Sequence, residues 1–369
     1  MLLAVPAAYA TYYLGVRLIS GAALSPSLNF VLWGGLWLGL GLSAFAPVVG
    51  RIGTPRLARP LQWAGYLCLA ALGGLLLLTL ITDLGFWLVP ASEAALRFRA
   101  MGEGTVILLL LAVGAWLAAH PRVSRITIEL AHLAPEFDGL RIVQLTDLHL
   151  GETLGADFAR SVVAATNALD PDVIVITGDM AEGSVATAAS AVLPLVELRA
   201  REGVFFVTGN HEYHHGGAEW VEHARSLGLT VLHNEHRVLE RGEGQLVIVG
   251  VPDLEGARFD PSHRPSLETA LAGAPQGPTI LLAHQPRFAT HARHAAITLM
   301  LSGHTHGGQV FPFGLFVQLD QPVLSGLRHI AGVLTYTSRG TGYWGPPIRL
   351  GARGEITEIT LRSRNRRAT

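Results

Sequence analysis

The sequence of 369 residues contains no lysine, so each of its 27 basic residues is an arginine. Without lysine, the chain cannot form a Schiff base with a carbonyl substrate or build the phosphate-binding loop of P-loop enzymes. Its single cysteine, Cys68, excludes an intramolecular disulfide and a metal site of several thiolates. The net charge of -1 lacks the basic surplus of general nucleic-acid binders, so we expect no nucleic-acid polymer as a partner.

Charge is scarce and unevenly distributed. Charged residues make up 15% of the chain, against about 25% in a typical soluble domain. Only six arginines and three acids precede residue 121. Four apolar stretches fill this region, at about 2–19, 28–49, 62–88 and 101–119, and each approaches or exceeds the roughly 20 residues that a membrane-spanning helix needs. We therefore expect residues 1–120 to form an all-α transmembrane region of about four helices.

The first stretch is the least apolar, because it carries three tyrosines and Arg17. A secretory signal peptide is the alternative, but three further spans follow and no convincing cleavage pattern precedes them. Buried helices of a soluble protein would show a polar face, which the four stretches mostly lack.

Arginines near the short loops predict the orientation, because cytoplasmic loops carry an excess of positive charge. Five arginines would lie on the cytoplasmic side and three outside: Arg51, Arg56, Arg59, Arg122 and Arg125 against Arg17, Arg97 and Arg99. Four spans would place both ends of the chain in the cytoplasm. Three spans would move only the amino terminus outside. We expect a multi-pass protein of the inner or cell membrane whose large carboxy-terminal domain, residues 121–369, is cytoplasmic.

From residue 121 the pattern changes to short strands that alternate with amphipathic helices, which is typical of a layered α/β domain. The polar piece 120–125 marks the boundary. Strands are predicted at 125–130, 141–146, 173–176, 204–207, 279–283 and 298–301, with a hairpin of 237–239 and 246–251. Helices are predicted at 158–169 and 185–199.

Residues that can bind a metal or move a proton follow five of these strands. They are Asp147 and His149, Asp179, Asn210 and His211, His284, and His304 and His306. The carboxyl ends of strands are where α/β sheets build their sites, because the loops converge there on a rigid frame. One such residue would be a turn residue, but five in succession predict a functional site.

The order of these residues resembles the calcineurin-like metallophosphoesterase superfamily. Its Asp-x-His, Gly-Asp, Gly-Asn-His, lone His and Gly-His-x-His blocks stand here as Asp147-Leu148-His149, Gly178-Asp179, Gly209-Asn210-His211, His284 and Gly303-His304-Thr305-His306. The closing segment 338–347 and Gly307-Gly308-Gln309 resemble the membrane-associated YkuE and YaeI-like branch. The resemblance implies a layered β-sandwich flanked by helices.

The metal chemistry also follows from residue types. Alternate residues of an extended backbone point the same way, so Asp-x-His and His-x-His can each reach one metal centre. The resemblance implies that Asp179 bridges two divalent ions, of which one is held by Asp147, His149 and His306 and the other by Asn210, His284 and His304. Histidine nitrogens mixed with oxygens and no thiolate favour Mn, Fe or Zn over Mg or Ca, without choosing among the three. A hydroxide bridging the ions would attack phosphorus in line.

His211 directly follows the ligand Asn210, so its side chain should point the opposite way, toward the substrate. The resemblance implies that it protonates the leaving oxygen or stabilises the transition state. Arg287, His214 and His215 are candidate contacts for a substrate phosphate. A surface ion pair for Arg287 and a solvated loop for the two histidines are the alternatives.

These features together predict a membrane-anchored, dinuclear metal-dependent phosphohydrolase. Its expected substrate is a phosphoester or pyrophosphate, with a lipid-linked molecule such as UDP-2,3-diacylglucosamine as the family precedent, and membrane lipid is an expected partner. A phosphodiesterase acting on a soluble or cyclic nucleotide is one alternative. A membrane sensor or scaffold that uses the fold only to bind a ligand is another.

Overall fold

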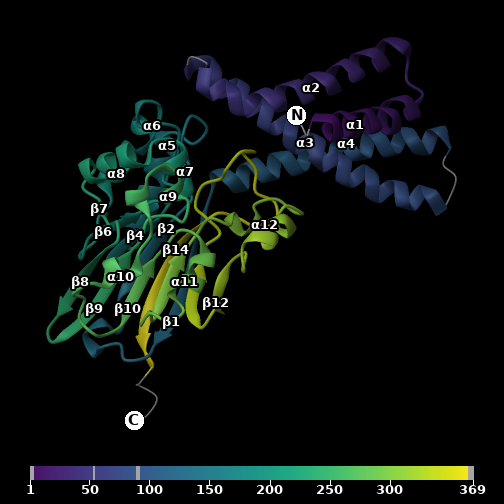
Figure 1. Ribbon diagram of the computed structural model, residues 1–369. Helices are drawn as coiled ribbons and strands as arrows, with labels where there is room; N and C mark the ends of the chain where they lie inside the picture. Colours follow the sequence, from purple (N-terminus) through teal and green to yellow (C-terminus); the bar gives the residue numbers. More distant parts are fainter. Residues whose placement is uncertain (1–3, 53–54, 89–91, 365–369) are drawn as a thin grey trace. The chain divides into compact units, whose positions relative to one another are not determined.

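The computed structural model describes residues 4–52, 55–88 and 92–364 (Figure 1). Internal contacts divide the chain into two units. A helical unit comprises Met1–Trp116 with Gly345–Ile348, and a second unit comprises Leu117–Trp344 with Arg349–Thr369. We call the second unit the site domain.

The amino-terminal region of the chain is helical. Its main helices are α1 (Ala4–Leu14), α2 (Pro26–Ile52), α3 (Pro55–Leu88) and α4 (Glu93–Ala119). Among the described residues, three helical stretches are long and apolar enough to cross a membrane, namely Pro26–Val49, Ala58–Trp87 and Glu93–Ala119. These three match the second, third and fourth predicted spans.

The first predicted span, 2–19, does not form one long helix. Its first two residues lie outside the described part of the chain. Helix α1 has only 11 residues and continues through one wider helical turn, Gly15–Ile19, before the chain bends at Ala23. This segment is shorter than the roughly 20 residues of a span. The expectation of about four spanning helices is therefore corrected to three candidates in the described chain.

Ion pairs connect these helices. Asp83 of α3 lies 2.5 Å from Arg17, which follows α1, and 2.5 Å from Arg99 of α4. Arg99 also lies 2.8 Å from Glu103, whose carboxylate accepts hydrogen bonds of 2.6 Å from Thr79 and Thr82. Two positive and two negative charges thus neutralise one another. Helix α4 starts at Glu93, eight residues before its predicted apolar run, and includes Arg99 of this network. An unpaired charge inside a bilayer is costly, so this pairing would reduce the cost of burying these residues in lipid.

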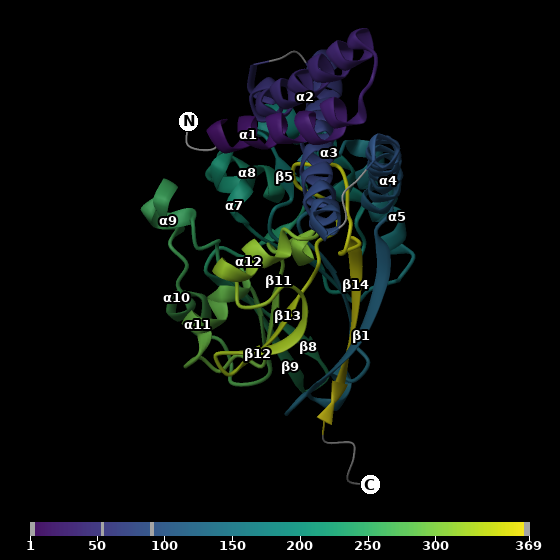
Figure 2. The same ribbon diagram turned by 90° about the vertical axis from the view of Figure 1, so that its right-hand side faces the viewer.

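The site domain is a sandwich of two six-stranded sheets (Figures 1 and 2). The first sheet contains, in spatial order, β1 (Arg122–Leu130), β14 (Glu355–Ser363), β2 (Arg141–Leu145), β4 (Val173–Thr177), β6 (Val204–Val207) and β7 (Thr230–Val231). The second contains β12 (Gly326–Ile330), β13 (Val333–Thr337), β11 (Leu299–Ser302), β10 (Thr279–Leu282), β9 (Gly244–Gly250) and β8 (Glu235–Arg241). Strands β3 (Leu150–Gly151) and β5 (Ala181–Glu182) form a separate pair.

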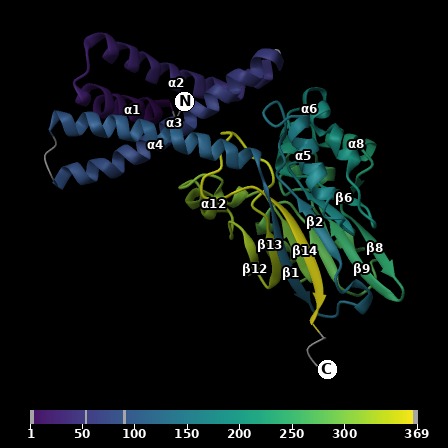
Figure 3. The same cartoon turned by 180° about the vertical axis from the view of Figure 1, so that it is seen from behind.

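Helices flank the sandwich, as Figures 1 and 3 show. They are α5 (Ala156–Asn167), α6 (Val185–Val192), α7 (Asn210–His214), α8 (Gly217–Ser226), α9 (Gly256–Phe259), α10 (Leu267–Leu271), α11 (Ala289–Ala292) and α12 (Gly314–Asp320). Inward-facing side chains of both sheets, such as Ile142, Val175, Ile248 and Leu301, form one buried core. This architecture confirms the predicted α/β sandwich.

The long strand β14 links the first sheet to the end of the chain. It pairs in parallel with β1, with Arg122 opposite Glu355, and antiparallel with β2, with Thr357 opposite Gln144. The start of β1 and the carboxyl end of β2 therefore lie at the same edge of the sheet. Strands β12, β13 and β14 were not expected, although the alternation of Glu355–Ser363 is a recognisable strand signal.

Candidate metal centre

The predicted ligands converge at the carboxyl edge of both sheets. Asp147 and His149 follow β2, Asp179 follows β4, and Asn210 starts α7 after β6. His284 follows β10 of the second sheet, and His304 and His306 follow β11. The neighbouring strands that lead to the site are parallel: β2 with β4, β4 with β6, and β10 with β11. This topology confirms the predicted placement at strand ends.

The backbone at these positions differs from the expectation. Asp147, His149, Asp179, His304 and His306 all have positive φ angles, between 45° and 70°. Their side chains share one side because of these left-handed turns, and the extended alternation assumed from the sequence is wrong here. Left-handed non-glycine residues each cost roughly 1–3 kcal/mol, and such strain gathers at functional sites.

The first ligand group contains Asp147, His149 and His306. The Nε2 atoms of His149 and His306 lie 3.1 Å apart, and Asp147 Oδ1 lies 3.4 Å from His306 Nε2. All three side chains are nearly inaccessible to solvent. Two imidazole nitrogens and a carboxylate oxygen so close together offer lone pairs to one point, as a metal site requires.

The second group contains Asp179, His284 and His304, with Asn210 beside them. His304 Nδ1 lies 3.0 Å from Asn210 Oδ1 and 3.2 Å from His284 Nε2. Asp179 Oδ2 lies 3.1 Å from His284 Nε2 and 3.7 Å from His149 Nε2 of the first group. The Asp179 carboxylate therefore stands between the two groups, where a bridging ligand would be.

The outer nitrogens of two ligands are held by oxygens. His149 Nδ1 lies 3.0 Å from Glu182 Oε2, and His284 Nδ1 lies 2.8 Å from the Thr177 carbonyl oxygen. Contacts of this kind fix the ring so that Nε2 keeps its lone pair for a metal. The residues present thus fit a divalent cation in each group.

Electrostatics support the same fit. Burial and the nearby Asp179 charge raise the pKa of Asp147. Burial alone would lower the pKa of His284, but Asp179, Asp147 and Asp253 outweigh it and raise that pKa well above its usual value. Carboxylates crowded away from water thus draw protons onto the site, and bound cations would satisfy the same negative charge.

His211 lies beside the two groups, with its ring centroid 4.6 Å from that of His149. Its backbone N–H donates to Asp179 Oδ1 over 2.9 Å, and its Nδ1 lies 2.8 Å from Glu182 Oε2. Burial would lower the pKa of His211, but Asp179 and Glu182 outweigh it and raise the pKa to about 9. The half-exposed indole of Trp344 meets the ring edge-on at 5.9 Å.

The candidate substrate contacts have partners within the protein. His215 Nε2 lies 3.2 Å from Glu182, and His214 Nε2 lies 3.4 Å from Glu255. Arg287 forms a surface ion pair of 2.8 Å with Asp320, the alternative considered for this residue. Contact of these three side chains with a substrate stays a prediction.

Two carboxylates important to the site were missed in the sequence. Glu182 touches His149, His211 and His215 at once. Fully buried Glu212 accepts backbone hydrogen bonds from Gly209, Asp179 and Ala181 over 2.7–3.1 Å and so joins two ligand loops. The sequence signal that could have identified them is their closeness to the motifs along the chain. Glu182 is three residues after Asp179, and Glu212 directly follows His211.

A buried arginine, Arg349, was also missed. It contacts His306 twice, with Nη1 3.1 Å from the carbonyl oxygen and Nη2 3.2 Å from Nδ1. It also donates to the carbonyl oxygens of Arg339 and Gly342 over 2.8 Å. Gly342 in turn donates to the Asp147 carbonyl oxygen over 2.9 Å. Arg349 therefore contacts the ligand His306 directly and is linked to the ligand Asp147 through Gly342. No local sequence pattern predicts these contacts.

The calcineurin-like phosphoesterase family pattern matches residues 140–308. The chain is 38% identical over 292 residues to a Danio rerio "Transmembrane protein with metallophosphoesterase domain", covering 74% of this chain and 67% of that protein. It is 32% identical to a metallophosphoesterase of Aquifex aeolicus, covering 66% of this chain and 92% of the relative. It is also 32% identical to the metallophosphoesterase YkuE of Bacillus subtilis, covering 65% of this chain and 85% of that protein.

The chain therefore belongs to the calcineurin-like metallophosphoesterase family. Its similarity to YkuE and to transmembrane members agrees with the resemblance seen in the motifs. With three candidate spans and such relatives, it is a membrane-associated member of this family. It spans about two thirds of the length of the Danio rerio relative.

Proposed function

We propose that this chain is a membrane-anchored phosphohydrolase that uses two divalent cations to cleave a phosphoester or pyrophosphate bond. The observation that carries the proposal is the position of the Asp179 carboxylate between the two ligand groups. Its Oδ2 atom lies 3.1 Å from His284 Nε2 and 3.7 Å from His149 Nε2. A carboxylate shared by two ligand groups is what a two-metal phosphoesterase needs to hold its cations close together.

The protein supplies two aspartates, four histidines and one asparagine as ligands. Asp147, His149 and His306 would hold one cation, Asn210, His284 and His304 the other, and Asp179 both. Mn, Fe or Zn fits these nitrogen and oxygen donors. When bound, the cations would attract the substrate phosphate and lower the pKa of a water so that it can attack phosphorus.

His211 is the proposed general acid. Glu182 holds its Nδ1 at 2.8 Å, so Nε2 is the nitrogen left to give a proton to the leaving oxygen. The backbone hydrogen bond from His211 to Asp179 fixes the ring relative to the ligands. His214, His215 and Arg287 are the proposed contacts for the rest of the substrate.

A lipid-linked substrate is supported by how the site domain is attached. Helix α4 ends at Ala119 and β1 begins at Arg122, so the attachment can extend over only roughly 11 Å. The strand register places the start of β1 at the same sheet edge as the ligands that follow β2. A soluble phosphodiester or cyclic nucleotide is the second candidate. We also propose that the domain is cytoplasmic, from the arginine distribution.

The test is hydrolysis by the purified full-length protein after loading with Mn. Bis-p-nitrophenyl phosphate serves as a generic phosphodiester, and membrane lipid and nucleotide extracts are screened by mass spectrometry for phosphorus-containing products. We expect metal-dependent turnover that is lost in Asp179→Ala. Absence of turnover on every substrate by metal-loaded protein would instead favour a membrane sensor or scaffold that only binds a ligand.

Orientation is tested separately with a reporter fused after Thr369. A reporter that functions only in the cytoplasm should be active. Activity of a reporter that functions only outside the membrane would overturn the cytoplasmic placement.

A further inference from the structure

Helix α12 exposes an apolar surface that the site domain does not cover. None of the seven residues from Gly314 to Asp320 is buried, although four of them are Leu315, Phe316, Val317 and Leu319. Leu319 is 85% exposed and Phe316 63% exposed, and Phe311 just before the helix is 70% exposed. A seven-residue helix is not stable alone in water, so α12, which has no fully buried side chain, would be stabilised by another apolar surface that covers it.

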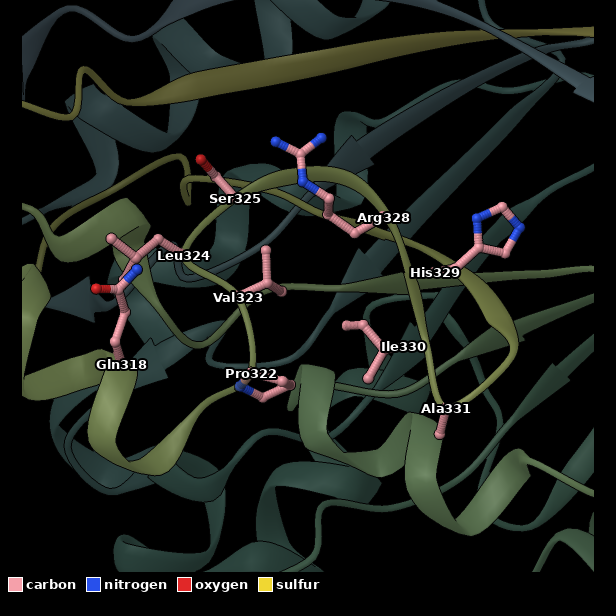
Figure 4. A pocket seen from close by; sticks show the side chains of 9 residues that line it. All are labelled: Gln318, Pro322, Val323, Leu324, Ser325, Arg328, His329, Ile330 and Ala331. Carbon is pink, nitrogen blue, oxygen red and sulfur yellow. The ribbon is translucent and has the colours of Figure 1, made fainter.

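The charge around α12 is one-sided. Between Gly303 and Gly354 the sequence contains a single carboxylate, Asp320, and four arginines, of which Arg349 is fully buried while Arg328 is exposed and lines the cavity beside α12. Asp320 is paired with Arg287. Arg328 and His329 line an open cavity of about 590 Å³ between α12 and β12, together with Gln318 (Figure 4). An apolar surface with basic neighbours and no free acid in this segment matches a lipid surface with anionic headgroups.

Backbone hydrogen bonds connect this surface to the start of the domain. Arg122 N donates to Gly354 O over 2.9 Å, and Phe311 N donates to Leu350 O over 2.9 Å. Only the segment from Leu350 to Gly354 separates these two contacts. Arg353 also donates to the carbonyl oxygen of His120, in the link that follows α4. Phe311 is thus connected to the start of β1 through five residues, Leu350–Gly354, and only residues 120 and 121 separate β1 from α4.

The same surface adjoins the metal centre. Phe311 follows the ligand His306 by five residues, and Gln309 between them holds Trp344. The Gln309 side chain donates to Trp344 O over 2.9 Å and accepts from Trp344 N over 3.0 Å. Trp344 in turn packs against His211. An element seated in lipid here would therefore bring the catalytic edge to the membrane surface.

We propose that Phe311, Phe313, Leu315, Phe316 and Leu319 form a docking surface that inserts into the lipid bilayer carrying the chain's own helices. Burying one such side chain contributes roughly 1.5–3 kcal/mol, so several together suffice to hold the domain against the membrane. We choose the bilayer as the occupant because only residues 120 and 121 separate the candidate span α4 from β1, and backbone hydrogen bonds connect the start of β1 to Phe311 through Leu350–Gly354. This inference goes beyond hydrolysis, and its test measures no turnover.

The experiment uses the full-length protein in lipid nanodiscs, with Cys68→Ser to remove the native thiol. Leu319→Cys is labelled with the environment-sensitive fluorophore NBD. Glu243→Cys, in the exposed turn between β8 and β9 at the opposite edge of the second sheet, is the matched control. Phe316→Cys provides a second labelled position if Leu319→Cys folds poorly.

In the lipid nanodisc, the emission of the label at residue 319 should lie to the blue of that at residue 243, because its surroundings are apolar. Spin-labelled lipid should quench the fluorescence at residue 319 at least about twofold. Aqueous iodide should quench only the label at residue 243. The effect should strengthen when phosphatidylglycerol replaces phosphatidylcholine. Iodide quenching at 319 equal to that at 243 would overturn the proposal. Protection of residue 319 from both quenchers would also overturn it, because protein would then cover the helix.

Discussion

The helical unit and the metal centre both bury charged residues, but they balance the charge differently. In the helices, Arg17, Asp83, Arg99 and Glu103 pair with one another and leave no net charge. In the metal centre, Asp147 and Asp179 lie among histidines whose nitrogens face one another. In a closed set of ion pairs each charge is neutralised within the protein, whereas carboxylates and imidazoles aimed at one point can take up a cation from outside.

The largest effect is expected for Asp179→Asn, which keeps the shape of the side chain but removes the charge shared by both ligand groups. Metal content should fall from about two ions per chain to fewer than one, and turnover should fall at least about 100-fold. Elemental analysis of the dialysed protein measures the first effect. Asp83→Asn, the matched change in the helices, should leave metal content unchanged; equal losses in both variants would remove the distinction between the two regions.

His211→Ala tests whether the centre separates metal binding from proton transfer. We expect both metals to remain and turnover to drop about 100-fold, because the proposed proton donor is gone. Rates on substrates with good leaving groups should fall less, since these need little protonation. Loss of metal with unchanged activity per bound metal would show that His211 is a ligand instead.

Arg99→Met tests the closed network in the helices. It leaves Glu103 without its ion-pair partner at a position where both side chains are nearly inaccessible, so we expect about 3 kcal/mol of destabilisation. Denaturant unfolding in detergent measures this loss. The double variant Arg99→Met, Glu103→Gln should recover part of it. A fall in metal content in the single variant would mean that the two regions are coupled.

Glu182→Gln should have the smallest effect. It removes the charge that orients His149 and His211 but can still accept hydrogen bonds, so we expect roughly tenfold weaker metal binding or turnover. Metal titration and initial rates check this expectation, with Glu243→Gln on the exposed hairpin turn as the control. An unchanged metal affinity together with unchanged rates would leave Glu182 without a positioning role.

Several parts of the fold could be predicted because they depend on local patterns. Val204–Val207 matches its predicted strand at both ends, and β2, β4, β10 and β11 each match within one residue. Long apolar runs predicted α2, α3 and α4. Helix α1 ends at Leu14, before the end of the first predicted span, because a wider helical turn follows at Gly15–Ile19, and composition alone does not register this change.

For the candidate metal centre, the residues and their location could be predicted, but the backbone conformation and the supporting contacts could not. Motif order identified the candidate ligand residues, and the strand ends placed them at one edge. The left-handed backbone at Asp147 and His149 was not predicted, because neither residue type requires it. Arg349 lies 43 residues from His306 along the chain, so only the folded structure reveals that they touch.

The sequence by itself determined which chemistry is available: no lysine nucleophile, no thiolate cluster, and a set of carboxylates and imidazoles at strand ends beside apolar helices. Local spacing is enough for this, because residue type and periodicity act over a few residues. The tertiary structure alone decided that Asp179 stands between two ligand groups, that Glu182 joins three histidines, and that α12 is left exposed. Distances between side chains depend on how distant segments pack, and packing is a property of the whole fold.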